Sequence, residues 1–255
     1  MIETVRATRY VTPLREGGSL PGIVEAADYG TYVVKFRGAG QGLPALVAEV
    51  VVAELGRRLG LRIPELRAVE LVPAIGRYEA DEEVQDLLTA SIGLNLGVDF
   101  LPGSFGWDAS YPADPDEAAT VLWLDAFTAN VDRSWRNPNL LLWHRDLWLI
   151  DHGAALYFHH SWDSATAGAD RFAGQPYDSA DHVFAAHADR SAALDAELAG
   201  RIEQSGLDEV LAAVPDEWLQ TSPRRPDPAA VRAGYVEYLR ARLAHRPAWL
   251  PGAGR

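Results

Sequence analysis

The segment from Asn130 to Gly153 reads N-V-D-R-S-W-R-N-P-N-L-L-L-W-H-R-D-L-W-L-I-D-H-G and holds the most informative pattern of the chain. Two apolar runs, N-L-L-L-W and L-W-L-I, flank the polar residues H-R-D, which predicts a short β-hairpin with a polar turn. Asp132 and Asn137 precede this hairpin, and Asp151 follows it in the sequence Asp-His-Gly. Because a loop, a hairpin and a strand end can bring separate side chains to one point, we expect these three residues to share a site.

The residue types in this pattern suit phosphoryl transfer, which depends mainly on positioning and electrostatics. One carboxylate must accept the proton of an attacking hydroxyl group, and oxygen ligands must hold Mg²⁺ against nucleotide phosphates. Asp132 and Asn137 are five residues apart, the spacing of the catalytic Asp and the metal-binding Asn of protein kinases. Asp151 lies fourteen residues after Asn137, where a kinase carries the Asp of its Asp-Phe-Gly motif. We therefore expect Asp132 to be a catalytic base, and Asn137 and Asp151 to be magnesium ligands.

The tetrapeptide H-R-D-L at residues 144–147 also matches the start of a kinase catalytic loop. An Asp at position 146 would then need an Asn five residues later, but residue 151 is Asp. We therefore interpret the tetrapeptide as the turn of the predicted hairpin.

Two further patterns give only weak support for a dinucleotide-binding site or a metal site. The sequence G-A-G-Q-G-L at residues 38–43 lacks the small residue that ends a dinucleotide-binding fingerprint, so we interpret it as a flexible loop. His152, His159 and His160 do not have the spacing of a helical zinc pair.

The upstream half contains Lys35, the only lysine among 23 Lys and Arg residues. It lies in the predicted strand Y-V-V-K-F, and its retention indicates chemistry that a compact ammonium performs and a guanidinium does not. The corresponding strand lysine of kinases pairs with nucleotide phosphates and with a Glu on the next helix. The predicted helix from Ala45 to Leu59 offers Glu49 and Glu54, of which we prefer Glu49.

The turn R-E-G-G-S-L-P-G precedes the hairpin that carries Lys35. Its residues Gly17, Gly18 and Ser19 could cover nucleotide phosphates with backbone and hydroxyl donors. We therefore include Gly18 and Ser19 among the nucleotide-binding candidates.

Periodicity divides the chain of 255 residues into two parts. Residues 1–73 are predicted to form a strand-rich domain with one helix, and residues 74–255 a mainly helical domain. Within the second part, residues 93–107 are predicted to be loop-rich, whereas residues 114–129 and most of residues 178–243 are predicted helices. The expectation is an α+β fold with two lobes and a cleft between them.

Composition excludes several classes of function. The absence of cysteine excludes disulfides, thiolate catalysis and zinc–thiolate sites. A formal charge of −13 disfavours nucleic acid as a partner. No long apolar window predicts a membrane span, and no signal peptide is evident at the N-terminus, so we expect a cytoplasmic protein.

The run N-V-D-R-S-W-R-N-P-N-L-L…L-I-D-H-G resembles the HipA-like kinases and, more distantly, the phosphatidylinositol-kinase-like group. The runs P-G-I-V-E-A…Y-V-V-K-F and A-E-V-V-V-A-E-L-G-R-R-L-G-L-R-I-P-E, with the tail V-P-D-E-W-L, are similar to a short branch of that family. The resemblance implies a protein-kinase-like fold that uses Mg·ATP. By motif position it makes Lys35 the ATP-contacting lysine, Asp132 the base, and Asn137 and Asp151 the metal ligands.

The chain departs from the HipA toxins in two respects. Arg133 follows the expected catalytic Asp at a position where the toxins vary, and the chain is much shorter than a full toxin. From the resemblance we therefore infer neither toxin action nor an antitoxin partner nor a tRNA-synthetase target for this chain.

Three functions remain open from the sequence. The first is a kinase that acts on a hydroxyl group of a protein Ser or Thr or of a small molecule. The second is a catalytically weak, pseudokinase-like nucleotide-binding regulator that acts through a protein partner. The third is an enzyme that transfers AMP from a nucleotide held in a reversed position.

Overall fold

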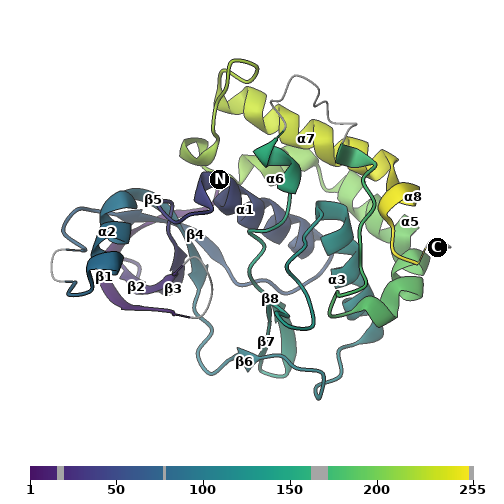
Figure 1. The fold of residues 1–255 in the computed structure, drawn as a ribbon, viewed down its shortest axis with the longest axis horizontal. Helices are drawn as coiled ribbons and strands as arrows, with labels where there is room; N and C mark the ends of the chain where they lie inside the picture. The colour runs from purple at the N-terminus through teal and green to yellow at the C-terminus, as the bar shows by residue number, and fades with distance from the viewer. Residues whose placement is uncertain (16–19, 77–78, 162–171, 253–255) are drawn as a thin grey trace.

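The computed structural model describes residues 1–15, 20–76, 79–161 and 172–252 (Figure 1). Its N-terminal part is a closed barrel of five strands in the order β1-β2-β3-β5-β4, in which β1 pairs in parallel with β4 and the other pairs are antiparallel. The strands are β1 (Thr4–Pro13), β2 (Gly22–Ala26), β3 (Thr31–Lys35), β4 (Leu66–Leu71) and β5 (Gly93–Asp99).

Alternation along β3 decides which side chains enter the barrel. Tyr32 and Val34 are buried in the barrel's apolar core, whereas Val33 and Lys35, one residue further along in each case, lie on its other face. This period of two is the pleat of a β-strand. It leaves Lys35 free to reach outside the barrel.

The helix α1 (Gly42–Arg58) lies between the barrel and the helical part of the molecule (Figure 1). Most of its residues are buried because it packs against α3, α5 and α6. The remaining helices are α2 (Glu82–Ala90), α3 (Pro115–Thr128), α5 (Ala188–Gln204), α6 (Leu207–Ala212), α7 (Pro228–Ala244) and α8 (Arg246–Trp249).

The helix α3 begins where the sequence predicts. Asp114 is its N-cap and accepts hydrogen bonds from the backbone N–H groups of Asp116 and Glu117, while Pro115 occupies the first turn. An N-cap acid followed by Pro is a strong start for a helix. The helix ends before Ala129, which adopts a left-handed conformation.

A second, small sheet joins the helical part. It consists of β6 (Phe105–Gly106), β7 (Leu140–Trp143) and β8 (Asp146–Leu149) in that order. Strands β7 and β8 form the predicted hairpin. Its turn is the dipeptide His144–Arg145, and both residues have positive φ angles, 53° and 74°, as a two-residue turn of the primed type requires. The H-R-D-L tetrapeptide thus lies at the predicted hairpin turn, with its first two residues in the turn and its last two in β8.

One prediction about the barrel was wrong. Residues 93–99 were expected in a loop, yet they form β5, which pairs with both β3 and β4. The glycines of this segment suggested a loop, but Gly97 has a packing role, because a Cβ atom there would lie 2.5 Å from Cγ2 of Val69. Because β5 lies beyond residue 73, the barrel contains strands from both predicted domains. The boundary at residue 73 stays a prediction.

The described chain is therefore α+β, with a strand-rich N-terminal part followed by helices, and is compatible with a kinase-like fold. Within the described ranges, no helix is both long and apolar enough to cross a membrane.

We expect Gly97→Ala to lower the free energy of unfolding by about 1–3 kcal/mol, because the added methyl group overpacks a filled barrel. Gly106→Ala is the matched control, since a Cβ atom at that glycine would meet no atom within 4 Å. Urea denaturation of both variants checks the prediction. Equal midpoints for the two variants would contradict the packing role of Gly97.

Candidate active site

Lys35, at the end of β3, is held between two carboxylates from different parts of the chain. Its Nζ contacts Oε1 of Glu49 on α1, and Oδ1 of Asp151 at 2.6 Å. Glu49 is 3% exposed, so this ion pair is largely removed from water. The structure thus brings together three of the residues that the sequence singled out.

The register of α1 selects between the two acids considered from the sequence. Glu54 points elsewhere and pairs with Arg57 at 2.9 Å and Arg58 at 2.8 Å. Glu49 lies on the buried face and contacts Lys35.

Burial and charge pairing oppose each other in this cluster, and the balance differs between its members. Burial by itself would lower the pKa of Lys35, but the negative charges of Glu49 and Asp151 outweigh it and raise the pKa. Burial acts to raise the pKa of Asp151, and the Lys35 ammonium overcomes it, so that pKa lies below its ordinary value. For Glu49 burial prevails over the Lys35 ammonium, and its pKa is raised.

The Asp-His-Gly segment turns closely around Glu49. Asp151 has a left-handed backbone with φ of 56°, which is uncommon for a residue with a side chain. A Cβ atom on Gly153 would lie 3.1 Å from Oε1 of Glu49, closer than side chains normally approach. Gly153 therefore allows this segment to approach α1.

The loop that carries Asp132 is ordered by amide side chains. Nδ2 of Asn137 donates to Oδ2 of Asp132 at 3.0 Å, and Nδ2 of Asn139 reaches the same oxygen at 3.3 Å. Oδ1 of Asn130 accepts from the backbone N–H of Asp132 at 3.2 Å. Asp132 and Asn137 are thus in direct contact, as their spacing suggested.

Arg133 links this loop to the Asp-His-Gly segment. Its Nε donates to Oδ2 of Asp125 on α3 at 2.6 Å, and both side chains are 0% exposed. Its Nη1 donates to the carbonyl oxygens of Asn139 and Ile150, and its Nη2 lies 3.1 Å from Nδ1 of His152. One guanidinium therefore connects α3, the loop before the hairpin and the segment after it.

The Asp125 carboxylate has two further partners. Nδ2 of Asn130 donates to Oδ1 at 2.8 Å, and Nε2 of His182 lies 3.0 Å from Oδ2. Burial raises the pKa of Asp125, but the Arg133 charge and the hydrogen bonds of His182 and Asn130 together lower it to about 2. The carboxylate stays ionised.

His152 is neutral. Burial, followed by the Arg133 charge, lowers its pKa to about 3. Because a guanidinium only donates hydrogen bonds, Nδ1 of His152 must accept, and the ring proton lies on Nε2. Among the described residues, that buried Nε2 has no hydrogen-bond partner.

A cavity of about 550 Å³ opens beside Lys35 and Asp151. It is lined from the barrel by Val33 and Val98 and from the hairpin by Leu141 and Ile150, among other residues. Asp132 and Asn137 do not line it. Lys35 and Asp151 therefore lie in the wall of a largely apolar cavity, whereas Asp132 and Asn137 lie outside it.

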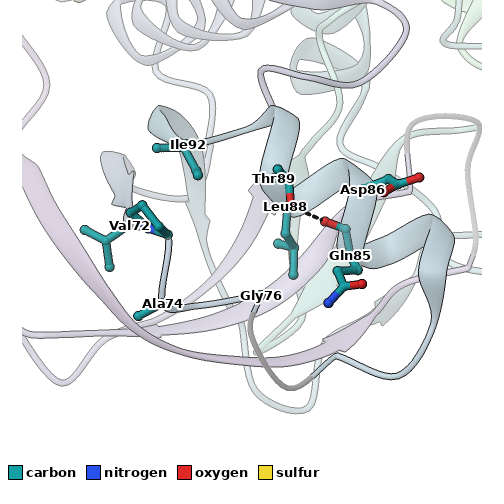
Figure 2. Close-up of a pocket in the computed structure, with 9 residues that line it drawn as sticks. Val72, Ala74, Gly76, Gln85, Asp86, Leu88, Thr89 and Ile92 are labelled. Carbon is teal, nitrogen blue, oxygen red and sulfur yellow. Dashed lines mark hydrogen bonds between the residues drawn. The ribbon is translucent and has the colours of Figure 1, made fainter.

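A second cavity, of about 560 Å³, lies on the barrel between α2 and the segment after β4 (Figure 2). It shares no lining residue with the first cavity. Its walls include Leu88, Thr89 and the exposed Ile92, and the only hydrogen bond drawn there is from the Thr89 hydroxyl to the Gln85 carbonyl at 2.8 Å (Figure 2). Among the described residues that line this wall, no charged side chains pair as they do around Lys35.

The sequence also singled out Gly18, Ser19, His159 and His160. Gly18 and Ser19 lie outside the described residues. His159 and His160 follow the Asp-His-Gly segment in a short 3₁₀ helix (Tyr157–His160), with their Nε2 atoms 3.2 Å apart. Over the described part of the chain, no group of three or more His, Cys, Asp or Glu residues could hold a metal ion.

Sequence reasoning missed Asp125, His182 and the role of Arg133. The Asp125 side chain could have been noticed, because it is a lone acid in the apolar run V-L-W-L-D-A-F, and buried acids usually have a partner. His182 lies 57 residues from Asp125 and has no local pattern that indicates the contact.

Comparison with protein families identifies the family of the chain. A protein-family model described as "HipA-like kinase" matches residues 8–249, which is nearly the whole chain. A search of curated proteins found no match.

We expect Arg133→Met to lower the free energy of unfolding by about 3–5 kcal/mol, because it leaves the Asp125 carboxylate buried without a counter-charge. Removing that charge as well, in Asp125→Asn with Arg133→Met, should recover part of the loss. Arg190→Met breaks the exposed pair with Asp116 and should change stability little. Urea denaturation of these variants checks the prediction, and wild-type stability of Arg133→Met would contradict it.

We expect the protein to lose stability on acidification between about pH 6.5 and pH 3, in part because of His159. Burial, followed by the charge of His160, lowers the pKa of His159 to about 3, against 6.5 for an ordinary His. In that range the unfolded chain binds a proton that the folded chain does not, so the free energy of unfolding falls as the pH falls. His159→Gln should flatten the curve of unfolding free energy against pH, and an unchanged slope would contradict the assignment.

Proposed function

Because the chain belongs to the HipA-like kinase family, we propose that it is an ATP- and Mg²⁺-dependent kinase. It transfers the γ-phosphoryl group to a hydroxyl group of a protein Ser or Thr or of a small molecule. The observation that carries the proposal is the position of Lys35, held by Glu49 and Asp151 at the wall of a cavity of about 550 Å³.

The cavity suits a nucleotide. Its volume falls in the usual range for small-molecule sites, which are mainly apolar with a few polar groups at fixed positions. Val33, Val98 and Leu141 offer apolar walls for a planar base, and Lys35 offers a cation for the phosphates. Glu49 holds the Lys35 ammonium, so the cation does not depend on the ligand for its position.

Asn137 and Asp151 fit the requirements of a magnesium site. Mg²⁺ prefers hard oxygen ligands, and each of the two residues supplies one. The amide nitrogen of Asn137 is used by Asp132, which leaves its carbonyl oxygen for a cation, and the Asp151 side chain is 48% exposed. When bound there, Mg²⁺ would neutralise the phosphate charge.

Asp132 is the proposed base. Both amides that contact its carboxylate bind Oδ2, and Oδ1 accepts no hydrogen bond from any residue the structure describes. Oδ1 can therefore take the proton of the acceptor hydroxyl. The hydroxyl oxygen then bonds to the γ-phosphorus, the bond from that phosphorus to its bridging oxygen breaks, and ADP leaves with the electron pair.

The arrangement favours an enzyme over a catalytically weak regulator. A nucleotide-binding regulator needs the lysine and the cavity, but it has no need of a carboxylate oriented by two amides. Transfer of AMP would use the same residues, and the mass added to the acceptor separates it from phosphoryl transfer.

We expect Asp151→Asn to abolish Mg²⁺-dependent binding of ATP in a calorimetric titration, because it removes the charged ligand. Asp132→Ala should bind Mg·ATP as the wild type does and lose transfer by about 10²–10⁴-fold, the usual contribution of a general base. Mass spectrometry of the acceptor after incubation with Mg·ATP measures transfer.

Asp146→Asn is the matched control for these variants. Asp146 is the first residue of β8, directly after the His144–Arg145 turn, and its side chain is 49% exposed, against 48% for Asp151. It should bind ATP and transfer phosphoryl groups normally. Normal turnover in Asp132→Ala or Asp151→Asn, or its loss in Asp146→Asn, would overturn the assignment.

A further inference from the structure

Trp135 and Arg136 lie in the loop between Asp132 and Asn137 and have no part in the function proposed above. Trp135 is 59% exposed, which is unusual for a residue of this size. The guanidinium carbon of Arg136 lies 4.0 Å from the centre of the Trp135 ring. The two side chains therefore form a stacked cation–π pair on the surface.

Arg136 has no acidic partner in the part of the chain that the structure describes. Among the residues that the structure describes, no carboxylate lies within ion-pair distance of its guanidinium, although the chain carries 36 acidic residues. Most of the other arginines do have such a partner, for example Arg62, Arg190 and Arg201. Because Arg136 lies over an indole ring and makes no ion pair with any described residue, its N–H groups remain available for an anion.

The backbone of this loop is fixed beside Asp132. Ser134 forms an isolated β-bridge with His182, and the backbone N–H of Trp135 donates to the Asp181 carbonyl oxygen at 3.1 Å. Arg136 directly precedes Asn137, whose amide contacts Asp132. Consecutive Cα atoms lie about 3.8 Å apart, so Arg136 follows the chain one residue away from a side chain that contacts Asp132.

The surface beside Asp132 is exposed. Asp132 is half-buried and does not line the cavity beside Lys35, whereas the neighbouring Val131 is 71% exposed. An acceptor hydroxyl at Asp132 therefore belongs to a molecule that lies across this surface, which fits an extended polypeptide segment better than an enclosed small molecule.

We propose that the Trp135–Arg136 pair binds an acidic residue that flanks the acceptor Ser or Thr of a polypeptide substrate. The guanidinium pairs with the carboxylate, and the indole ring packs against the adjacent main chain. The proposal rests on the kinase function proposed above. The net charge of −13 repels an acidic substrate at a distance, but salt screens this repulsion beyond about 8 Å at physiological ionic strength, so the local cation decides the preference.

The test uses pairs of Ser-containing peptides that differ by Asp or Asn at one flanking position at a time, incubated with the full chain and Mg·ATP. We expect the wild type to phosphorylate at least one Asp peptide about tenfold more efficiently in kcat/KM than its Asn partner, the effect of one charge-assisted hydrogen bond. Arg136→Gln should remove this ratio, Arg136→Lys should retain part of it, and Arg136→Glu should favour a Lys peptide instead.

Arg6→Gln is the matched control, because Arg6 on β1 is also exposed and has no ion pair among the described residues. It should keep the wild-type preference. Equal use of all paired peptides by the wild type, or an unchanged preference in Arg136→Gln, overturns the proposal.

Calorimetry with Mg·ATP distinguishes failure of the polypeptide-acceptor proposal from failure of the kinase proposal. Binding of Mg·ATP without transfer to any peptide overturns the polypeptide acceptor and leaves the nucleotide site standing. Absence of nucleotide binding by the wild type overturns the kinase proposal and, with it, the acceptor proposal.

Discussion

The ion pair of Asp125 and Arg133 has no exposed side-chain surface, and the arrangement around it depends on this fact. Removing two charges from water is costly unless every remaining donor and lone pair is satisfied. For Arg133 this requires carbonyl groups from both ends of the β7–β8 hairpin, together with the ring of His152. The loop that carries Asp132 and the segment that carries Asp151 are therefore held in one arrangement by a single buried guanidinium.

On the barrel side, the buried carboxylate of Glu49 likewise needs a partner of opposite charge. It is a buried charge on α1, a helix whose other buried residues are apolar or glycine. An unpaired carboxylate there would be strongly unfavourable, so α1 must pack where Lys35 of β3 and the Asp-His-Gly segment can reach it. The barrel, α1 and the hairpin are thus aligned by charge compensation as well as by the apolar core.

Local patterns predicted the elements around the site, because hairpins, caps and helix periods are encoded by neighbouring residues. The β2–β3 hairpin, α1, α3 and the β7–β8 hairpin were all expected from them. Strand β5 was not, because Gly93 and Gly97 resemble loop residues until the side chains that cross them are known. The partners of Arg133 were missed for a related reason: Asp125 and His182 reach it through tertiary packing, which leaves no spacing rule in the sequence.

The local pattern of α1 also does not determine whether Glu49 or Glu54 contacts Lys35. Glu49 and Glu54 are five residues apart, which is about 140° around an α-helix. The rotation of α1 about its axis therefore decides which acid faces β3, and propensity does not determine that rotation. Packing does, because the buried face of α1 is shared with α3 and α6.

The scarcity of lysine has a practical consequence for chemical labelling. Apart from the amino terminus, Lys35 carries the only primary amine of the polypeptide, and its side chain is 16% exposed between two acids. A reagent that acylates amines therefore has one internal target, which lies in the wall of the cavity. Acylation at this position requires the Lys35 amine to be deprotonated and accessible, so a ligand in the cavity would slow it, and the change can be followed without a fluorophore or an engineered residue.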